Sequence, residues 1–164
     1  MTTRRTRGKI VMAIDPGTLH TGVCIVLVTA SKNPKFDIQH LEVITTKSNQ
    51  TTKERFDKIT KRLQSLIEEF EVTEVICEAF EVRTWQQPRS KSTVMSKLIN
   101  AISQAVFEKR IPFMLSSPDI KRSAKLKELE DSMKAQIYEK KTPYFTHAQD
   151  AIRHALYHIK VGSK

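Results

Sequence analysis

Two strongly apolar runs near the amino terminus, separated by a short turn, restrict the fold more than any other feature of the chain. Lys9–Ile14 reads as a buried strand, and Gly22–Val28 is apolar at nearly every position, which is typical of a strand covered on both faces. After a turn at Asn33-Pro34, the more polar run Phe36–Ile44 reads as a third strand. Three consecutive strands with short links predict an antiparallel meander whose third strand lies toward an edge.

The remaining sequence alternates helices with short strands. Thr51-Thr52-Lys53-Glu54 is a capping box, and the apolar periodicity after it predicts an amphipathic helix over about residues 52–70. Strands are expected at residues 72–77 and Ile111–Leu115, helices over Val94–Val106 and from about Thr146, and a further helix opening at Ser117-Pro118-Asp119. This order predicts an α/β fold around a mixed sheet.

Length and charge restrict the function classes. We expect one domain at residues 9–160, after a flexible basic arm at residues 1–8. The net charge of +10 favours a polyanionic partner such as nucleic acid, and a charge that only keeps the protein soluble is the alternative. No stretch approaches the roughly 18 consecutive apolar residues of a membrane span, so a cytoplasmic protein is expected. Cys24 and Cys77 fall inside predicted strands and are expected to be core residues.

Acidic residues stand where two predicted strands end. Asp15 follows the first strand directly, Glu78 ends another strand, and His147 and Asp150 lie three residues apart on the last predicted helix. Carboxylates joined by one histidine are suitable ligands for Mg²⁺ or Mn²⁺. Two such ions offset the repulsion between acids and a scissile phosphate, activate a water and stabilise the leaving oxygen. This set of residues therefore predicts a nuclease that cleaves phosphodiesters.

Three segments carry a family resemblance: Ile14-Asp15-Pro16-Gly17-Thr18 with Thr21-Gly22, then Val75-Ile76-Cys77-Glu78, and finally His147-Ala148-Gln149-Asp150-Ala151. They resemble the three signatures of RuvC-type Holliday-junction resolvases, and the resemblance extends from about Lys9 to Ile159. It implies an RNase H-like mixed five-stranded sheet flanked by helices, in a homodimeric, Mg²⁺-dependent endonuclease. Such an enzyme resolves four-way (Holliday) junctions and other branched DNA in recombination and repair, and leaves a 5′-phosphate.

The resemblance also assigns the site. In the family four positions bind two Mg²⁺ ions per active site, and here they are Asp15, Glu78, His147 and Asp150, all expected to be catalytic, with Mn²⁺ able to substitute. Family members carry Asp or His at the third position. The segment beginning at Lys134 resembles the family's Lys-x-Gln-Val segment, and Lys121 matches a basic residue after the fifth strand, so both are expected to face the DNA backbone.

One segment departs from the family pattern. Where the family has an aromatic residue three positions beyond the catalytic Glu, this chain has Glu81, with aromatic residues one position before it and four after it. Basic residues interleave with the second aromatic, Trp85, as in loops that stack on unpaired bases and grip phosphates; packing in the core or in a dimer is the alternative for Trp85. A divergent member, such as a phage-encoded one, with a broad preference for branched DNA is expected. The DNA contacts expected in this segment are Phe80, Arg83, Trp85, Arg89 and Lys91.

Other interpretations stay open. The same acids would serve an RNase H-like nuclease acting on RNA or RNA–DNA hybrids, and a junction-binding protein that has lost catalysis is a non-enzymatic alternative. His154 and His158 are expected at the surface, and His20 is a candidate for orienting water or phosphate. The helix Val94–Val106 is the candidate dimer interface, and a bacterial cell or a phage-infected host is the expected setting.

Overall fold

The strands form a mixed five-stranded sheet, as predicted. The computed structural model describes residues 8–30, 35–80, 89–119, 131, 134–139 and 145–161. The strand order is β3-β2-β1-β4-β5; β1, β2 and β3 are an antiparallel meander, and β4 and β5 run parallel to β1. The elements are β1 (Lys9–Asp15), β2 (His20–Val28), β3 (Phe36–Thr45), α1 (Thr52–Glu69), β4 (Glu74–Glu78), α2 (Arg89–Glu108), β5 (Phe113–Ser116), α4 (Lys134–Glu139) and α5 (Phe145–Val161).

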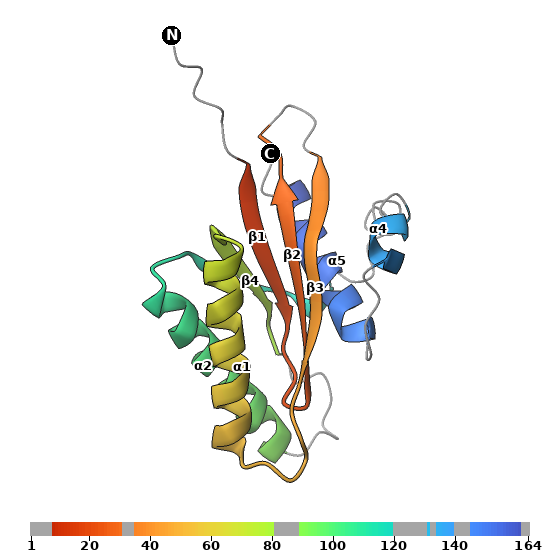
Figure 1. The fold of residues 1–164 in the computed structure, drawn as a ribbon. Helices are drawn as coiled ribbons and strands as arrows, with labels where there is room; N and C mark the ends of the chain where they lie inside the picture. Colours follow the sequence, from red (N-terminus) through yellow and green to blue (C-terminus); the bar gives the residue numbers. More distant parts are fainter. Residues whose placement is uncertain are drawn as a thin grey trace.

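Helices cover both faces of this sheet. Figure 1 shows α1 and α2 on one side of the strands and α5 on the other. The pleat of β1 sends Met12 and Ile14 toward α1 and α2, and Val11 and Ala13 toward α5. All four side chains are fully buried, which explains why the run that predicted this strand is apolar at every position.

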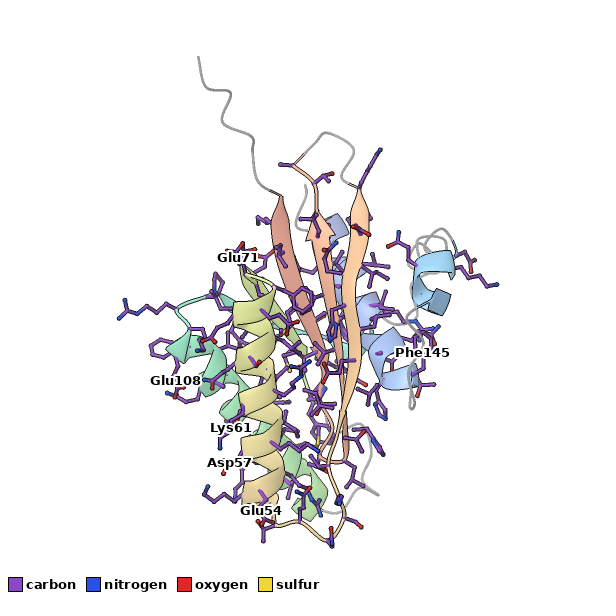
Figure 2. The ribbon with its side chains drawn as sticks, in the orientation of Figure 1. Glu54, Asp57, Lys61, Glu71, Glu108 and Phe145 are labelled. Carbon is purple, nitrogen blue, oxygen red and sulfur yellow. The ribbon has the colours of Figure 1, made fainter. Side chains whose placement is uncertain are left out.

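The helix α1 forms where the capping box predicts it. The Thr51 hydroxyl accepts a hydrogen bond from the Glu54 amide at 3.2 Å, and the Thr51 amide donates to the Glu54 carboxylate at 2.7 Å. Figure 2 shows Glu54 and Lys61 on the outer side of α1, and both are exposed. The inner side buries four aliphatic side chains, each worth about 1.5–3 kcal/mol. They are Ile59, Leu63, Leu66 and Ile67.

Other predictions of local structure are also confirmed. Cys24 and Cys77 are fully buried, and β3 lies at one edge of the sheet. The strand expected at residues 111–115 is β5, at the other edge. Ser117 accepts a hydrogen bond from the Asp119 amide at 3.3 Å, as expected of a capping serine, and the rest of the helix predicted there lies outside the described residues.

Two further predictions concern the basic arm and membrane-spanning helices. Residues 1–7, most of the expected basic arm, lie outside the described part of the chain. Within the described part, no helix has both the length and the apolar character needed to cross a membrane.

Candidate active site

The two strand-end acids lie side by side at the carboxyl ends of two inner strands of the sheet. Adjacent parallel strands β1 and β4 are in register with Ile14 opposite Cys77, so the next residue of each strand, Asp15 and Glu78, ends its strand at the same level. Because alternate side chains share a face, Asp15 follows Ala13 onto the α5 side and Glu78 follows Ile76. The acids thus point toward the face that α5 covers.

The loop after Asp15 is held by threonines. The Thr21 hydroxyl donates to the Gly17 carbonyl at 2.7 Å, and the buried Thr46 donates to the Thr18 carbonyl at 2.6 Å. A side chain at Gly17 would place its Cβ 2.2 Å from the His20 carbonyl oxygen, so this tight turn needs glycine. The Asp15 backbone therefore enters a fixed turn, and its carboxylate is 11 % exposed.

A glycine also sets the distance between α5 and the sheet. A Cβ at Gly22 would lie 2.1 Å from the carbonyl oxygen of His147, so the helix backbone sits directly on β2. The fully buried Ala148, Ala151 and Ala155 make the same close approach possible along the helix. This proximity brings His147 Nδ1 to 2.9 Å from Asp15 Oδ2.

Four polar residues of α5 form a stripe on the side of the helix that faces the acids. His147, Asp150, His154 and His158 are spaced by three, four and four residues, which places them on one helix face. His158 Nε2 lies 3.7 Å from a carboxylate oxygen of Glu74, and its side chain is 26 % exposed. Asp150 accepts a hydrogen bond from Arg153 at 3.0 Å.

The expectation that His154 lies at the surface is wrong. Its ring is fully buried; Nε2 lies 3.0 Å from Glu78 Oε2, and Nδ1 lies 2.9 Å from the Ser116 hydroxyl. The reason is its position four residues after Asp150, which keeps it on the inner stripe over β4 and β5. The spacing between His147 and His154 indicates that both lie on one helix face, but histidine as a residue type is only intermediate in its tendency to be buried.

Each of the four predicted metal ligands is placed by the structure. Asp15 and His147 are in contact, Glu78 is beside Asp15 in the sheet, and Asp150 is one turn along α5. Among the described residues, no three His, Cys, Asp or Glu side chains are gathered as ligands of one ion. The donor set of carboxylate oxygens and one imidazole fits a divalent cation of the Mg²⁺ class.

The charges of the two acids act on a neighbouring thiol. Burial raises the pKa of the Cys77 thiol well above its usual range, and the negative charges of Asp15 and Glu78 raise it further. A divalent cation bound by Asp15 and Glu78 would offset their negative charges.

The structure describes the side chains of two of the expected DNA contacts, and the others lie outside the described part. Lys134 is exposed at the start of α4, which Gln136 attaches to the sheet edge by accepting a hydrogen bond from the Ile38 amide at 3.0 Å. Phe80 is half-buried against the core beneath α1 and α2. Arg83, Trp85 and Lys121 lie outside the described residues, as do the side chains of Arg89 and Lys91.

His20 lies next to His147. The His20 ring centroid is 5.9 Å from that of His147, and His20 Nδ1 is 3.4 Å from the Thr45 hydroxyl.

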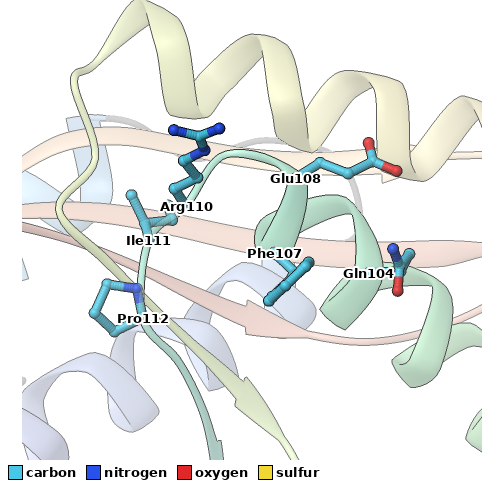
Figure 3. Close-up of a pocket in the computed structure, with 6 residues that line it drawn as sticks. All are labelled: Gln104, Phe107, Glu108, Arg110, Ile111 and Pro112. Carbon is cyan, nitrogen blue, oxygen red and sulfur yellow. The ribbon is translucent and has the colours of Figure 1, made fainter.

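A separate hollow of about 650 Å³ lies at the opposite end of β5 from Ser116 (Figure 3). It is lined by Gln104, Phe107, Glu108, Arg110, Ile111 and Pro112.

Comparisons with known proteins agree with this arrangement. A family model described as crossover junction endodeoxyribonuclease RuvC matches residues 11–158. A search of curated protein sequences gives no match. The structure of T. thermophilus RuvC in complex with a Holliday junction substrate is 24% identical, with a TM-score of 0.76, and the match covers 94% of this chain and 97% of that one.

Two more distant structures share the fold. The yeast mitochondrial Holliday junction resolvase Ydc2 is 14% identical with a TM-score of 0.59, over 93% of this chain and 78% of that one. The fowlpox virus resolvase, solved with Holliday junction DNA, is 12% identical with a TM-score of 0.56, over 94% of this chain and 99% of that one. At these identities the structural matches establish the fold, and the family model establishes the family.

Proposed function

The chain belongs to the RuvC family of crossover junction endodeoxyribonucleases and is a structure-selective junction endonuclease, for which we propose a two-metal active site built from Asp15, Glu78, His147 and Asp150. The activity depends on divalent metal ions, and we propose Mg²⁺ with Mn²⁺ as a substitute. The observation that carries this assignment is the contact between Asp15 on β1 and His147 on α5, directly beside Glu78.

The side chains divide the work. Divalent ions held by these four residues would supply an activated water and offset the charge that develops on the phosphate. Asp15 and Glu78 hold fixed positions because each ends a buried strand, and both are largely buried, at 11 % and 14 % side-chain exposure. His147, at 38 % side-chain exposure, is more open to solvent than these two acids. His154 and Arg153, which are not proposed ligands, offset the charges of Glu78 and Asp150 by hydrogen bonding.

Affinity for branched DNA comes from positively charged side chains on the rest of the surface. The net charge of +10 supplies a large electrostatic contribution, and contacts to phosphates position a duplex without reading its sequence. Lys134 is a proposed phosphate contact because Gln136 and the buried Ile137 anchor α4 while the lysine stays exposed. Lys121 and the segment around Trp85 complete the proposed surface.

The proposal includes a homodimer of nuclease domains formed by residues 9–160. A four-way junction has two-fold symmetry, so two active sites are needed to cut two opposed strands. On α2, Leu98, Ile102 and Val106 pack into the core. A dimer interface on this helix would therefore use its outer side, where Phe107 is 73% exposed. The proposed location is the cytoplasm of a bacterial cell or a phage-infected host, where the DNA substrate is found.

A cleavage assay with matched substrates tests the proposed function. Four-way junction, flap, duplex and RNA–DNA hybrid substrates of the same sequence are incubated with the enzyme and Mg²⁺. We expect paired cuts in the junction that leave 5′-phosphates, loss of cleavage on chelation, and recovery with Mn²⁺. Preferential cutting of the hybrid would favour the RNase H-like alternative, and binding without cleavage in any metal would favour a junction-binding protein.

A further inference from the structure

His154 is a buried polar side chain that the proposed reaction does not use directly. Its exposure is 0 %, and it lies between Glu78 at the end of β4 and Ser116 at the end of β5, which pair in the parallel register. A buried imidazole without partners is strongly destabilising, so its presence among apolar neighbours requires both hydrogen bonds. Apolar side chains would fill the same space at lower cost, which indicates a role beyond packing.

The two contacts fix the orientation of the ring. An ionised carboxylate only accepts hydrogen bonds, so Nε2 carries the proton that is donated to Glu78 Oε2 at 3.0 Å. In the neutral ring Nδ1 is then an acceptor, and the Ser116 hydroxyl donates to it at 2.9 Å. The order of donors is therefore from Ser116 to His154 to Glu78, and it ends on one oxygen of the carboxylate.

We propose that His154 is a positioning residue that holds Glu78 in the orientation needed to bind metal, with Ser116 fixing the ring. The hydrogen bond at 3.0 Å fixes the position of Oε2 relative to the ring, and with it the orientation of the carboxylate. Groups that orient a metal ligand in this way change metal affinity or activity by about 10–100-fold when removed. The inference rests on the proposed assignment of Glu78 as a metal ligand.

A Ser–His–acid row is also found in hydrolases, where the hydroxyl is a nucleophile. That role requires the imidazole to exchange a proton with the substrate at the surface of a cleft. His154 is fully buried and its Nε2 faces Glu78, so the ring has no path to a substrate. The geometry favours a fixed support for the acid.

Two amide substitutions separate positioning from packing. The amide of His154→Gln reaches the position of Nε2 and can still donate to Glu78. The shorter amide of His154→Asn reaches only the position of Nδ1, next to Ser116. We expect His154→Asn to weaken Mn²⁺ binding, measured by electron paramagnetic resonance on the DNA-free protein, by about 10–100-fold, and His154→Gln to restore most of it. Equal Mn²⁺ affinities for the two variants would overturn the proposal.

Kinetics give a second readout. With the four-way junction at limiting Mn²⁺, His154→Asn is expected to lower kcat and leave KM unchanged, and saturating Mn²⁺ is expected to recover much of the rate. A purely structural role predicts loss of folded protein without recovery by metal. If variants at position 154 do not fold, Ser116→Ala decides: a measurable loss of Mn²⁺ affinity supports the proposal, and an unchanged affinity contradicts it.

Two control variants complete the design. His40→Gln removes a histidine with a similar contact, Nε2 to Glu42 Oε2 at 2.8 Å, on the edge strand β3, and it should not change Mn²⁺ affinity. Glu78→Gln separates the two claims. If Glu78→Gln still binds Mn²⁺ and cleaves as the parent does, the proposed metal site is wrong. If Glu78→Gln loses both while His154→Asn loses neither, only the positioning role is wrong.

Discussion

The two faces of the sheet are built from the same strands but differ in chemistry. Toward α1 and α2, the buried residues of β1 and β4 are apolar throughout, as in Ile14 and Cys77. Toward α5, the same two strands end in Asp15 and Glu78, and His147 and His154 of α5 contact these acids. Both faces bury an apolar core, and the period of two residues along a strand places the proposed site on one of them only.

The difference teaches where polar residues are tolerated in a small core. On the α5 face the buried His154 is tied to two side chains, and in the described part of the chain every buried side-chain nitrogen or oxygen has a hydrogen-bond partner. Polar groups in such a network can stay rigid without losing much stability. Substitutions of the proposed site residues on the α5 face should therefore lower cleavage, and substitutions in the α1 face should lower stability.

Asp15→Asn gives the largest expected effect on cleavage. Loss of a metal ligand removes several kcal/mol of transition-state stabilisation, so kcat should fall by about a thousandfold or more. Junction binding should survive, because it depends on contacts between Lys and Arg side chains and phosphates. Leu63→Ala on α1 is the complementary variant. It should reduce the free energy of unfolding by about 2–5 kcal/mol and leave kcat unchanged below its melting temperature. Full activity in Asp15→Asn would remove the assignment.

Gly22→Ala should affect both properties. Its Cβ would lie 2.1 Å from the His147 carbonyl oxygen, so α5 must move away from β2 and carry His147 off Asp15. We expect a loss of about 1–3 kcal/mol in the free energy of unfolding together with a fall in kcat. Cys24→Ala, on the same strand and face, removes atoms and should leave kcat unchanged. Parent-like cleavage by Gly22→Ala would show that α5 need not lie this close.

Neutralising Lys121 and Lys134 tests the surface that surrounds the site. If each contacts one phosphate, changing both to Gln should reduce the slope of log affinity against log salt by about two units, without altering the melting temperature. Lys53→Gln with Lys61→Gln, on the exposed side of α1, is the matched control and should not change the slope. An unchanged slope in the Lys121 and Lys134 variant would place both lysines away from the DNA.

The smallest expected effect lies at the rim of the α1 face. Hydrogen bonds from His40 and Arg62 lower the pKa of Glu42 to about 2 from its ordinary 4.5. A lowered pKa stabilises the fold above about pH 4.5, and this contribution is lost as the pH falls toward 2. Because the side chain is partly exposed, we expect only about 1 kcal/mol after solvent screening.

Unfolding of Glu42→Gln at two pH values measures this contribution. The variant should be about 1 kcal/mol less stable than the parent at neutral pH and nearly equal to it close to pH 2. The same difference at both pH values would show that the carboxylate charge does not stabilise the fold.

The sequence predicted the elements whose signals are local. The capping box at Thr51 predicted the start of α1, and the apolar runs before Asp15 and Glu78 predicted strands that end in acids. The role of Ser116 was not predicted, because it depends on the register of β5 against β4. The burial of His154 also depends on that neighbouring strand. Relations between elements thus limited what the sequence alone revealed.

A crystal structure of the protein soaked with Mn²⁺ tests the central claim most directly. Anomalous difference density should show metal between Asp15 and Glu78 at the ends of β1 and β4, with His147 and Asp150 of α5 completing the ligands. Density bound elsewhere on the surface, with His147 still hydrogen-bonded to Asp15, would contradict the account.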